Sequence, residues 1–209
     1  MNVYIIRHGE TESNKNKVHQ YPDTPLSLLG KQQAEEIAEK LLSANITKIY
    51  SSDLIRATDT AKIISEKIKT NLSLMPEIRE IKKPSQIWGK NHGDKEILKI
   101  KEQIDKNYHL KDWHYSDEEN FFDVKERTKK FINYLKTLKE TENVLVVTHG
   151  YIAKMFLALV IFDEKLTPEV YLKIYQNVRI SNVSISNFIY SNNKWELVYW
   201  NRPLSIFNG

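Results

Sequence analysis

The sequence contains no cysteine among its 209 residues. This absence excludes disulfide bonds, a thiolate nucleophile and a zinc site built on cysteine. There is also no apolar run near the roughly 18 residues of a membrane-spanning helix, and no low-complexity tract or internal repeat. The apolar start, Val3 to Ile6, has no preceding positive region and is too short for a signal peptide. We therefore expect a cytoplasmic protein that does not associate with membranes.

The composition that remains is that of an ordinary globular protein, with 41% hydrophobic and 28% charged residues. No Gly/Ser-rich linker divides the chain, so we expect one domain over residues 1–209. The net charge is +4, and the excess lysines are scattered along predicted helices, as on a solvated surface that also attracts anions. No basic stripe is interleaved with aromatic residues, so a nucleic-acid partner is not predicted.

Three short apolar runs are typical of buried strands. They are Val3 to Ile6, Lys48 to Tyr50, and Asn143 to Thr148. In the last run four apolar residues are continuous rather than alternating, which indicates a strand covered on both faces, as in a parallel α/β sheet. Near the C-terminus, Ser184 to Ile189 and Trp195 to Trp200 alternate around an Asn-rich turn, which predicts a hairpin.

Between these runs, apolar residues recur with the one-sided spacing of amphipathic helices. Ser27 is the expected N-cap of the first helix. The stripes are Ala34-Ile37-Ala38-Leu41, Ala57-Ala61-Ile64-Ile68, Val124-Phe131-Leu135-Leu138 and Ile152-Met155-Phe156-Leu159. The segment 82–120 has weaker periodicity, and we interpret it as a mostly helical insertion over the sheet edge that forms a lid. Its aromatic residues are Trp88, Tyr108, Trp113 and Tyr115. Two interpretations are open for them: they line a substrate pocket, or they form a small core of the insertion.

Two histidines follow predicted strands directly, and each is followed by glycine: His8-Gly9 and His149-Gly150. Ligands of α/β sheets bind outside the carboxyl ends of the strands, so both imidazoles should face one crevice. Glycine allows the backbone to approach a ligand closely, and Gly150 also opens a helix whose free N–H groups favour an anion.

Two arginines accompany these histidines. Arg7 adjoins His8, and Arg56 lies on the first turn of the helix after Ser51-Ser52-Asp53. The guanidinium group is planar, permanently charged and suited to bidentate phosphate binding. This set predicts a phosphate pocket without a metal or cofactor. The other histidines lack the ligand spacing of a metal site; they are His19, His92, His109 and His114.

The run Arg7-His8-Gly9-Glu10-Thr11 resembles the signature of the histidine phosphatase superfamily, also called the phosphoglycerate mutase-like family. Further blocks resemble the family in the same order along nearly the whole chain. They are Asn14, Asp23-Thr24-Pro25-Leu26-Ser27 with Gly30, Ser51-Ser52-Asp53-Leu54 with Arg56-Ala57, Ile78-Arg79-Glu80, Val147-Thr148-His149-Gly150 and Asn182-Val183-Ser184-Ile185.

The resemblance implies a three-layer α/β/α sandwich with a largely parallel sheet. It also implies a reaction in two in-line displacements, in which His8 attacks phosphorus and carries the phosphoryl group as a phosphohistidine. Glu80 is the implied general acid and base. The implied phosphate-binding residues are Arg7, Arg56, His149 and Asn14, with Gly150 beside them.

The region of the acid departs from the family pattern. Many phosphatases of the family carry Gly and then Trp-Glu-Gly after the acid, whereas this chain reads Ile81-Lys82-Lys83-Pro84-Ser85-Gln86-Ile87-Trp88-Gly89-Lys90. Glu77 is therefore the alternative acid, and Asp94 is a more distant one. Arg127 is interpreted as structural.

The expected function is a histidine acid-type phosphatase, a phosphoric monoester hydrolase that acts on a small phosphorylated metabolite. The alternatives are a phosphoglycerate mutase, a phosphoprotein phosphatase and a non-catalytic phosphate-binding domain. The mutases usually carry a Tyr-Gly-rich stretch after the acid, which this chain lacks. The sequence identifies neither the substrate nor the oligomeric state.

Overall fold

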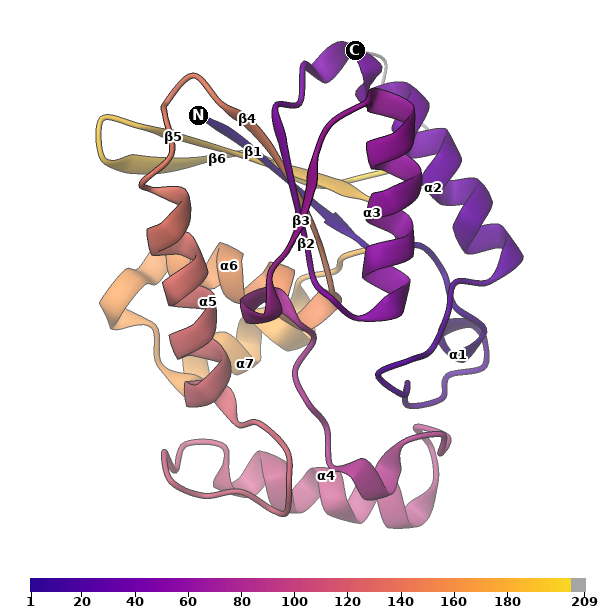
Figure 1. The fold of residues 1–209 in the computed structure, drawn as a ribbon. Coiled ribbons are helices and arrows are strands. Elements are labelled where there is room, and N and C mark those ends of the chain that lie inside the picture. The colour runs from indigo at the N-terminus through magenta and orange to yellow at the C-terminus, as the bar shows by residue number, and fades with distance from the viewer. Residues whose placement is uncertain (204–209) are drawn as a thin grey trace.

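A computed structural model describes residues 1–203 and contains one six-stranded sheet. The strand order is β3-β2-β4-β1-β5-β6 (Figure 1). The first four strands are parallel, β5 pairs antiparallel with β1, and β6 pairs antiparallel with β5. The strands are β1 (Asn2–Arg7), β2 (Lys48–Ser51), β3 (Leu72–Leu74), β4 (Asn143–Thr148), β5 (Ile185–Ser191) and β6 (Lys194–Arg202). The prediction of a largely parallel sheet that ends in a hairpin is confirmed.

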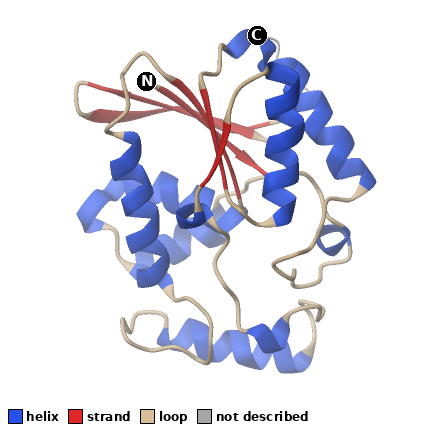
Figure 2. Cartoon of the chain, viewed as in Figure 1, coloured by secondary structure: helices blue, strands red, loops and turns tan. Residues whose placement is uncertain are grey.

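Helices cover both faces of the sheet, so the predicted three-layer sandwich is confirmed (Figures 1 and 2). One layer consists of α2 (Leu28–Lys40) and α3 (Ile55–Ile68). The opposite layer consists of α5 (Phe121–Leu135), α6 (Gly150–Phe162) and α7 (Pro168–Asn177). The remaining helices are α1 (Glu12–Lys15), α4 (Lys95–Asn107), and the 3-10 turns η1 (Leu41–Ala44), η2 (Pro76–Ile78), η3 (Ser85–Ile87) and η4 (Asp163–Lys165). None of the helices in residues 1–203 has the length and apolarity to cross a membrane.

The position of β4 between two helical layers explains why its sequence is continuously apolar. Val144 and Val146 point into the core shared with α5 and α6, whereas Leu145 and Val147 point into the core shared with α2 and α3. Successive side chains of a strand face opposite sides, so a central strand covered by two layers needs apolar residues at every position.

Local signals set two of the element boundaries. The Ser27 hydroxyl accepts a hydrogen bond from the Gly30 amide at 3.0 Å and caps α2, as predicted. At the hairpin, Asn192 and Asn193 adopt φ values of 49° and 61°. Asparagine tolerates this left-handed region better than most residues, and it is common in two-residue hairpin turns.

The segment 82–120 lies beyond the carboxyl ends of the parallel strands, at the bottom of Figure 1, rather than along an edge strand. The segment is less helical than predicted, because η3 and α4 hold 16 of its 39 residues, and turns and loops make up the rest. The physical reason is that Pro84, Gly89 and Gly93 interrupt the helical pattern before α4. The segment therefore covers the mouth of the site rather than the side of the sheet.

Candidate active site

A cavity of about 650 Å³ opens at the carboxyl ends of β1 and β4. Six of the seven residues predicted for the site line it: Arg7, His8, Asn14, Arg56, Glu80 and Gly150. The seventh, His149, is fully buried behind them, and its ring centroid lies 5.0 Å from that of His8. Strands far apart in the sequence thus bring the predicted groups together, because parallel strands end at the same edge of the sheet.

The His8 imidazole is held in one tautomer. Its Nδ1 lies 2.7 Å from the Gly9 carbonyl oxygen, which can only accept, so Nδ1 carries the proton and Nε2 keeps its lone pair. Burial, followed by the nearby cations of Arg56 and Arg7, lowers the pKa of His8 well below its ordinary value of 6.5. His8 is therefore neutral at physiological pH, with Nε2 available as a nucleophile.

His149 has one partner and one unpartnered ring nitrogen. Its Nε2 lies 2.8 Å from the Ser52 hydroxyl oxygen, and its Nδ1 is buried without a hydrogen bond. When the Ser52 hydroxyl donates to Nε2, the ring proton lies on Nδ1. Burial and the Arg56 charge lower the pKa of His149 well below 6.5. The ring can then offer a neutral N–H donor to a ligand oxygen.

The two arginines are anchored by backbone carbonyl groups. Arg7 Nη1 donates to the Ile180 carbonyl at 3.0 Å, and Arg56 Nη1 donates to the Tyr21 carbonyl at 3.2 Å. In both side chains Nε is buried without a partner. Burial lowers the pKa of Arg56 to about 10 and also lowers that of Arg7. Within the described chain neither guanidinium forms an ion pair, so an anion would satisfy their charge and their free donors.

The loop after β1 is fixed by tight backbone packing. A Cβ atom on Gly9 would lie 2.4 Å from the Gly30 carbonyl oxygen, so only glycine fits there. The Gly9 amide donates to the Thr60 hydroxyl at 3.0 Å. Asn182 Nδ2 donates to the His8 carbonyl at 2.8 Å and contacts Asn14 Oδ1 at 3.4 Å. Because the Asn14 oxygen is occupied, its amide nitrogen is the donor that remains for the cavity.

Two carboxylates line the cavity, Glu80 and Glu119, and Glu119 is paired with Arg127, whereas Glu77 and Asp94 do not line it. Glu80 Oε1 accepts from the Ile81 amide at 3.0 Å and from the Tyr151 amide at 3.2 Å. The Tyr151 amide lies at the start of α6, where the helix N-terminus favours negative charge. The geometry therefore favours Glu80 over the alternative acids considered from the sequence.

Arg127 holds the loop that carries Glu80. Its Nη1 donates to the carbonyl groups of Glu77 and Arg79, both at 2.7 Å, and its Nε donates to Glu119 at 2.7 Å. Its guanidinium group is therefore committed to the protein, as the structural interpretation of this residue predicted. The Thr148 hydroxyl holds the same loop through the Ile78 carbonyl.

Sequence reasoning gave no role to several residues that contact the site. Ser52 and Thr60 bond to His149 and Gly9, Asn182 supports the His8 loop, and Tyr151 binds Glu80. For Ser52 and Asn182 the only signal was membership in the blocks Ser51-Ser52-Asp53 and Asn182-Val183, and Thr60 and Tyr151 lie outside these blocks. Of the aromatic residues in the insertion, Trp88 lines this cavity, whereas Tyr108 and Trp113 line a neighbouring one.

The two buried histidines should make the protein less stable in acid. Their pKa values are lowered on folding, so below pH 6.5 the unfolded chain binds protons that the native state does not. Above pH 6.5 protonation of these histidines does not lower the free energy of unfolding. Below pH 6.5 each histidine should lower it by up to about 1.4 kcal/mol per pH unit as the pH falls. Urea unfolding at pH 7.5, 6.5 and 5.5 measures this slope. It should be shallower in His149→Gln, and an unchanged slope would contradict a neutral His149.

Comparison with known proteins agrees with this geometry. Residues 3–203 match the family model of the histidine phosphatase superfamily (branch 1). Among curated proteins, a probable phosphoglycerate mutase GpmB from Proteus mirabilis (strain HI4320) is 29% identical, covering 96% of this chain and 90% of the relative. The corresponding protein from Enterobacter sp. (strain 638) is 28% identical with the same coverage.

Solved structures share the fold. The mycobacterial glucosyl-3-phosphoglycerate phosphatase, solved with VO3, has a TM-score of 0.76 and 25% identity, covering 97% of this chain and 99% of the other. The α-ribazole phosphatase from Shigella flexneri has a TM-score of 0.78 and 21% identity, covering 96% of each chain.

Proposed function

The chain belongs to the histidine phosphatase superfamily and is a phosphoryl-transfer enzyme, and from this premise we propose that it hydrolyses small phosphomonoesters through a phosphohistidine on His8. The observation that carries the proposal is the state of the His8 ring. Its Nδ1–H is bonded to the Gly9 carbonyl, its Nε2 is free, and the ring lines a cavity that holds two unpaired guanidinium groups. A neutral imidazole beside fixed cations is suited to attack a phosphoryl group.

In the first step, Nε2 of His8 forms a bond to phosphorus while the P–O bond to the alcohol breaks. Glu80 gives its proton to the departing oxygen, so the alcohol leaves neutral. Arg7, Arg56 and the Nδ1–H of His149 donate to the three transferring oxygens, where negative charge gathers in the transition state. The alignment costs little reorganisation because backbone carbonyl groups already hold both arginines.

In the second step, a water molecule attacks the phosphorus of the phosphohistidine. The Glu80 carboxylate takes a proton from this water, the P–N bond breaks, and inorganic phosphate leaves. The His8 ring regains its lone pair on Nε2 and keeps its proton on Nδ1, so the enzyme returns to its starting state. All the positive charge in this scheme comes from side chains, and we propose no metal or cofactor.

The proposal is tested by hydrolysis of p-nitrophenyl phosphate and of a panel of metabolite phosphates, with and without excess chelator. Phosphate release that is unchanged by chelator supports the proposal, and the order of the panel identifies preferred substrates. If no ester is hydrolysed, a phosphomonoesterase function is wrong. If activity disappears with chelator and returns with a divalent metal, the scheme without metal is wrong.

Replacing Glu80 with glutamine should separate substrates by their leaving group. For an alkyl phosphate, kcat/KM should fall about 100-fold, because the alkoxide leaves without a proton. For p-nitrophenyl phosphate, kcat/KM should fall less than about threefold, because its leaving group is stable as an anion. Steady-state rates on both esters measure the difference.

Glu77→Gln is the matched control, since Glu77 lies on the same loop but outside the cavity. This variant should keep wild-type rates on both esters. If kcat/KM for alkyl phosphates falls selectively in Glu77→Gln and not in Glu80→Gln, the general acid is Glu77 instead.

A phosphoglycerate mutase is the second candidate, because the curated relatives described above carry that name. A mutase returns the phosphoryl group of the phosphohistidine to a second position of the substrate and keeps water away from it. The test is interconversion of 2-phosphoglycerate and 3-phosphoglycerate, measured beside release of inorganic phosphate. Interconversion faster than release would favour the mutase, and release without interconversion would favour the phosphatase.

A further inference from the structure

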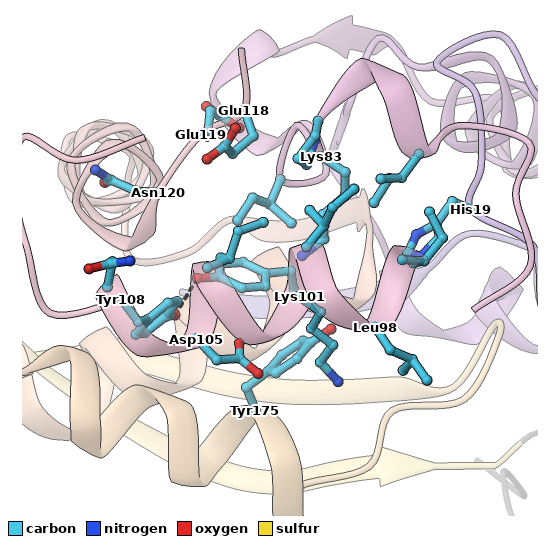
Figure 3. A pocket seen from close by; sticks show the side chains of 18 of the residues that line it. His19, Lys83, Leu98, Lys101, Asp105, Tyr108, Glu118, Glu119, Asn120 and Tyr175 are labelled. Atoms are coloured by element: carbon cyan, nitrogen blue, oxygen red, sulfur yellow. Dashed lines mark hydrogen bonds between the residues drawn. The ribbon is translucent and has the colours of Figure 1, made fainter. Parts of the chain in front are cut away.

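A second cavity, which we call the α4 chamber, lies between helix α4 and the start of α6 (Figure 3). Its volume is about 240 Å³. Much of its wall is apolar or aromatic, formed by Ile81, Ile87, Ile97, Ile104, Tyr108 and Trp113. For comparison, an apolar cavity of about 150 Å³ is large enough to bind benzene. The chamber therefore has room for a group somewhat larger than one six-membered ring.

Helix α4 presents an apolar face to this chamber. Ile97, Ile100 and Ile104 line it with the spacing i, i+3 and i+7, which places them on one side of the helix. Only Ile97 is buried, and no helix or strand of the described chain packs closely along α4. An amphipathic helix normally buries such a face against the protein, whereas Ile100 and Ile104 are only half-buried, so this partly uncovered face indicates a place for an apolar ligand.

Several polar groups of the chamber have partners within the protein, and the charged side chains of Lys83, Lys101 and Asp105 also line it (Figure 3). The hydroxyl groups of Tyr108 and Tyr151 lie 2.6 Å apart, as the dashed line in Figure 3 marks. Glu118 accepts from the Ser116 amide at 2.8 Å, and Asn120 donates to two carbonyl groups of the preceding loop. These groups cannot bind a polar ligand without losing their present hydrogen bonds. The isoleucine and aromatic wall, together with the polar groups that already have partners, therefore favours an apolar group over a sugar or a peptide.

The chamber adjoins the phosphate cavity on the side of the acid. Ile81, Lys83, Tyr151 and Tyr175 line both spaces. Ile81 directly follows Glu80, and the amides of Ile81 and Tyr151 hold the Glu80 carboxylate. The oxygen that Glu80 protonates belongs to the leaving alcohol, so the carbon skeleton of that alcohol would extend toward the chamber.

We propose that the α4 chamber binds the leaving group, and that the substrates are monoesters of compact apolar alcohols about the size of a ring. This inference rests on the proposed function, since it takes Glu80 as the acid and His8 as the nucleophile. The phosphate is bound by cations in one cavity and the carbon skeleton by isoleucine and aromatic side chains in the other. Such a division selects substrates by their apolar surface, because each buried methylene contributes about a three- to fourfold gain in binding.

The test compares methyl phosphate with cyclohexylmethyl phosphate, two primary alkyl esters with similar leaving groups. For the wild type, kcat/KM should be about 100-fold higher for the cyclohexylmethyl ester. Ile104→Trp fills the chamber and should reduce this ratio at least tenfold, while kcat/KM for methyl phosphate changes less than about threefold. Ile104→Asp places a charge in the chamber and should also abolish the preference.

Gln103→Trp is the matched control, because Gln103 is an exposed neighbour on α4 that does not line the chamber. This variant should keep the wild-type ratio. A wild-type ratio near one, or a ratio that Ile104→Trp and Ile104→Asp leave unchanged, would overturn the chamber proposal while the phosphatase function stands. If neither ester is hydrolysed and p-nitrophenyl phosphate is also inert, the proposed function fails and this inference fails with it.

Discussion

Replacing His8 with alanine is expected to lower kcat/KM at least about 1,000-fold on every phosphate ester. The variant retains the arginines that bind phosphate but has no atom that can form the covalent bond to phosphorus. Water would have to attack directly, from a position that the imidazole now occupies. Residual binding and electrostatic stabilisation should leave a low rate above the background. Steady-state kinetics of wild type and His8→Ala measure the loss.

The same substitution should remove the covalent intermediate. A phosphohistidine has a P–N bond that hydrolyses in acid and survives in alkali, so rapid mixing followed by an alkaline quench should trap it on the wild type. Intact mass or a radioactive phosphate label then measures the phosphoenzyme. His109→Ala is the control, because His109 is exposed and lines neither cavity. Covalent phosphate that persists in His8→Ala would assign the nucleophile to another residue.

Replacing Arg56 with methionine is expected to lower kcat/KM about 100- to 1,000-fold with little change in thermal stability. The loss of rate follows from removing a fixed cation that faces the charge developing on the transferred oxygens. The stability should change little, because removing a desolvated cation near the Arg7 charge offsets the loss of its attraction to Glu80 and of its hydrogen bonds to the Tyr21 and Pro22 carbonyl groups. Methionine has a similar length and carries no charge that needs solvation.

Two measurements separate this result from a general loss of structure. Inorganic phosphate should raise the melting temperature of the wild type and have a much smaller effect on Arg56→Met, because the anion no longer neutralises that charge. Arg179→Met is the matched control, since Arg179 is exposed and lies outside both cavities. A large fall in melting temperature in Arg56→Met would show that Arg56 is mainly structural.

The site also has an energetic consequence for folding. His8 and His149 are buried in their neutral forms, Arg56 is a buried cation and Arg7 a half-buried one, and within residues 1–203 neither arginine forms an ion pair with a carboxylate. All of these features oppose folding in the absence of an anion, because burial penalises unpaired charge and unused donors. The two apolar cores on either side of the sheet supply the stability that keeps these groups in place.

The two candidate acids, Glu77 and Glu80, show what a local sequence pattern cannot predict. The sequence carries Glu77 and Glu80 three residues apart on a short loop, and both were possible. Helix periodicity does not apply to a loop, so the spacing alone cannot say which carboxylate faces the phosphate. Arg127 and Thr148 fix the loop through its carbonyl groups, and the amides of Ile81 and Tyr151 then hold Glu80 at the cavity.

The insertion shows the same limit on a larger scale. Its residues predicted helix and a cover for the site, and α4 is the helix that forms. The α4 chamber forms where α4 faces Tyr151 at the start of α6 and Leu172 and Tyr175 on α7. No periodicity within residues 82–120 encodes which distant surface they will face.

By itself, the sequence determined the strands, the helices around them and the position of His8, His149, Arg7 and Arg56 at one edge of the sheet. These features follow from short-range patterns: continuous apolar runs, one-sided stripes, and glycine directly after each strand-end histidine. Only the tertiary structure decided the partners of those residues, such as Ser52 for His149 and Asn182 for the His8 loop, which lie 97 and 174 residues away. It also placed Glu80, and neither Glu77 nor Asp94, at the cavity, and it formed the α4 chamber. The physical reason is that hydrogen-bond partners and cavities arise where remote segments meet, and no local spacing specifies that meeting.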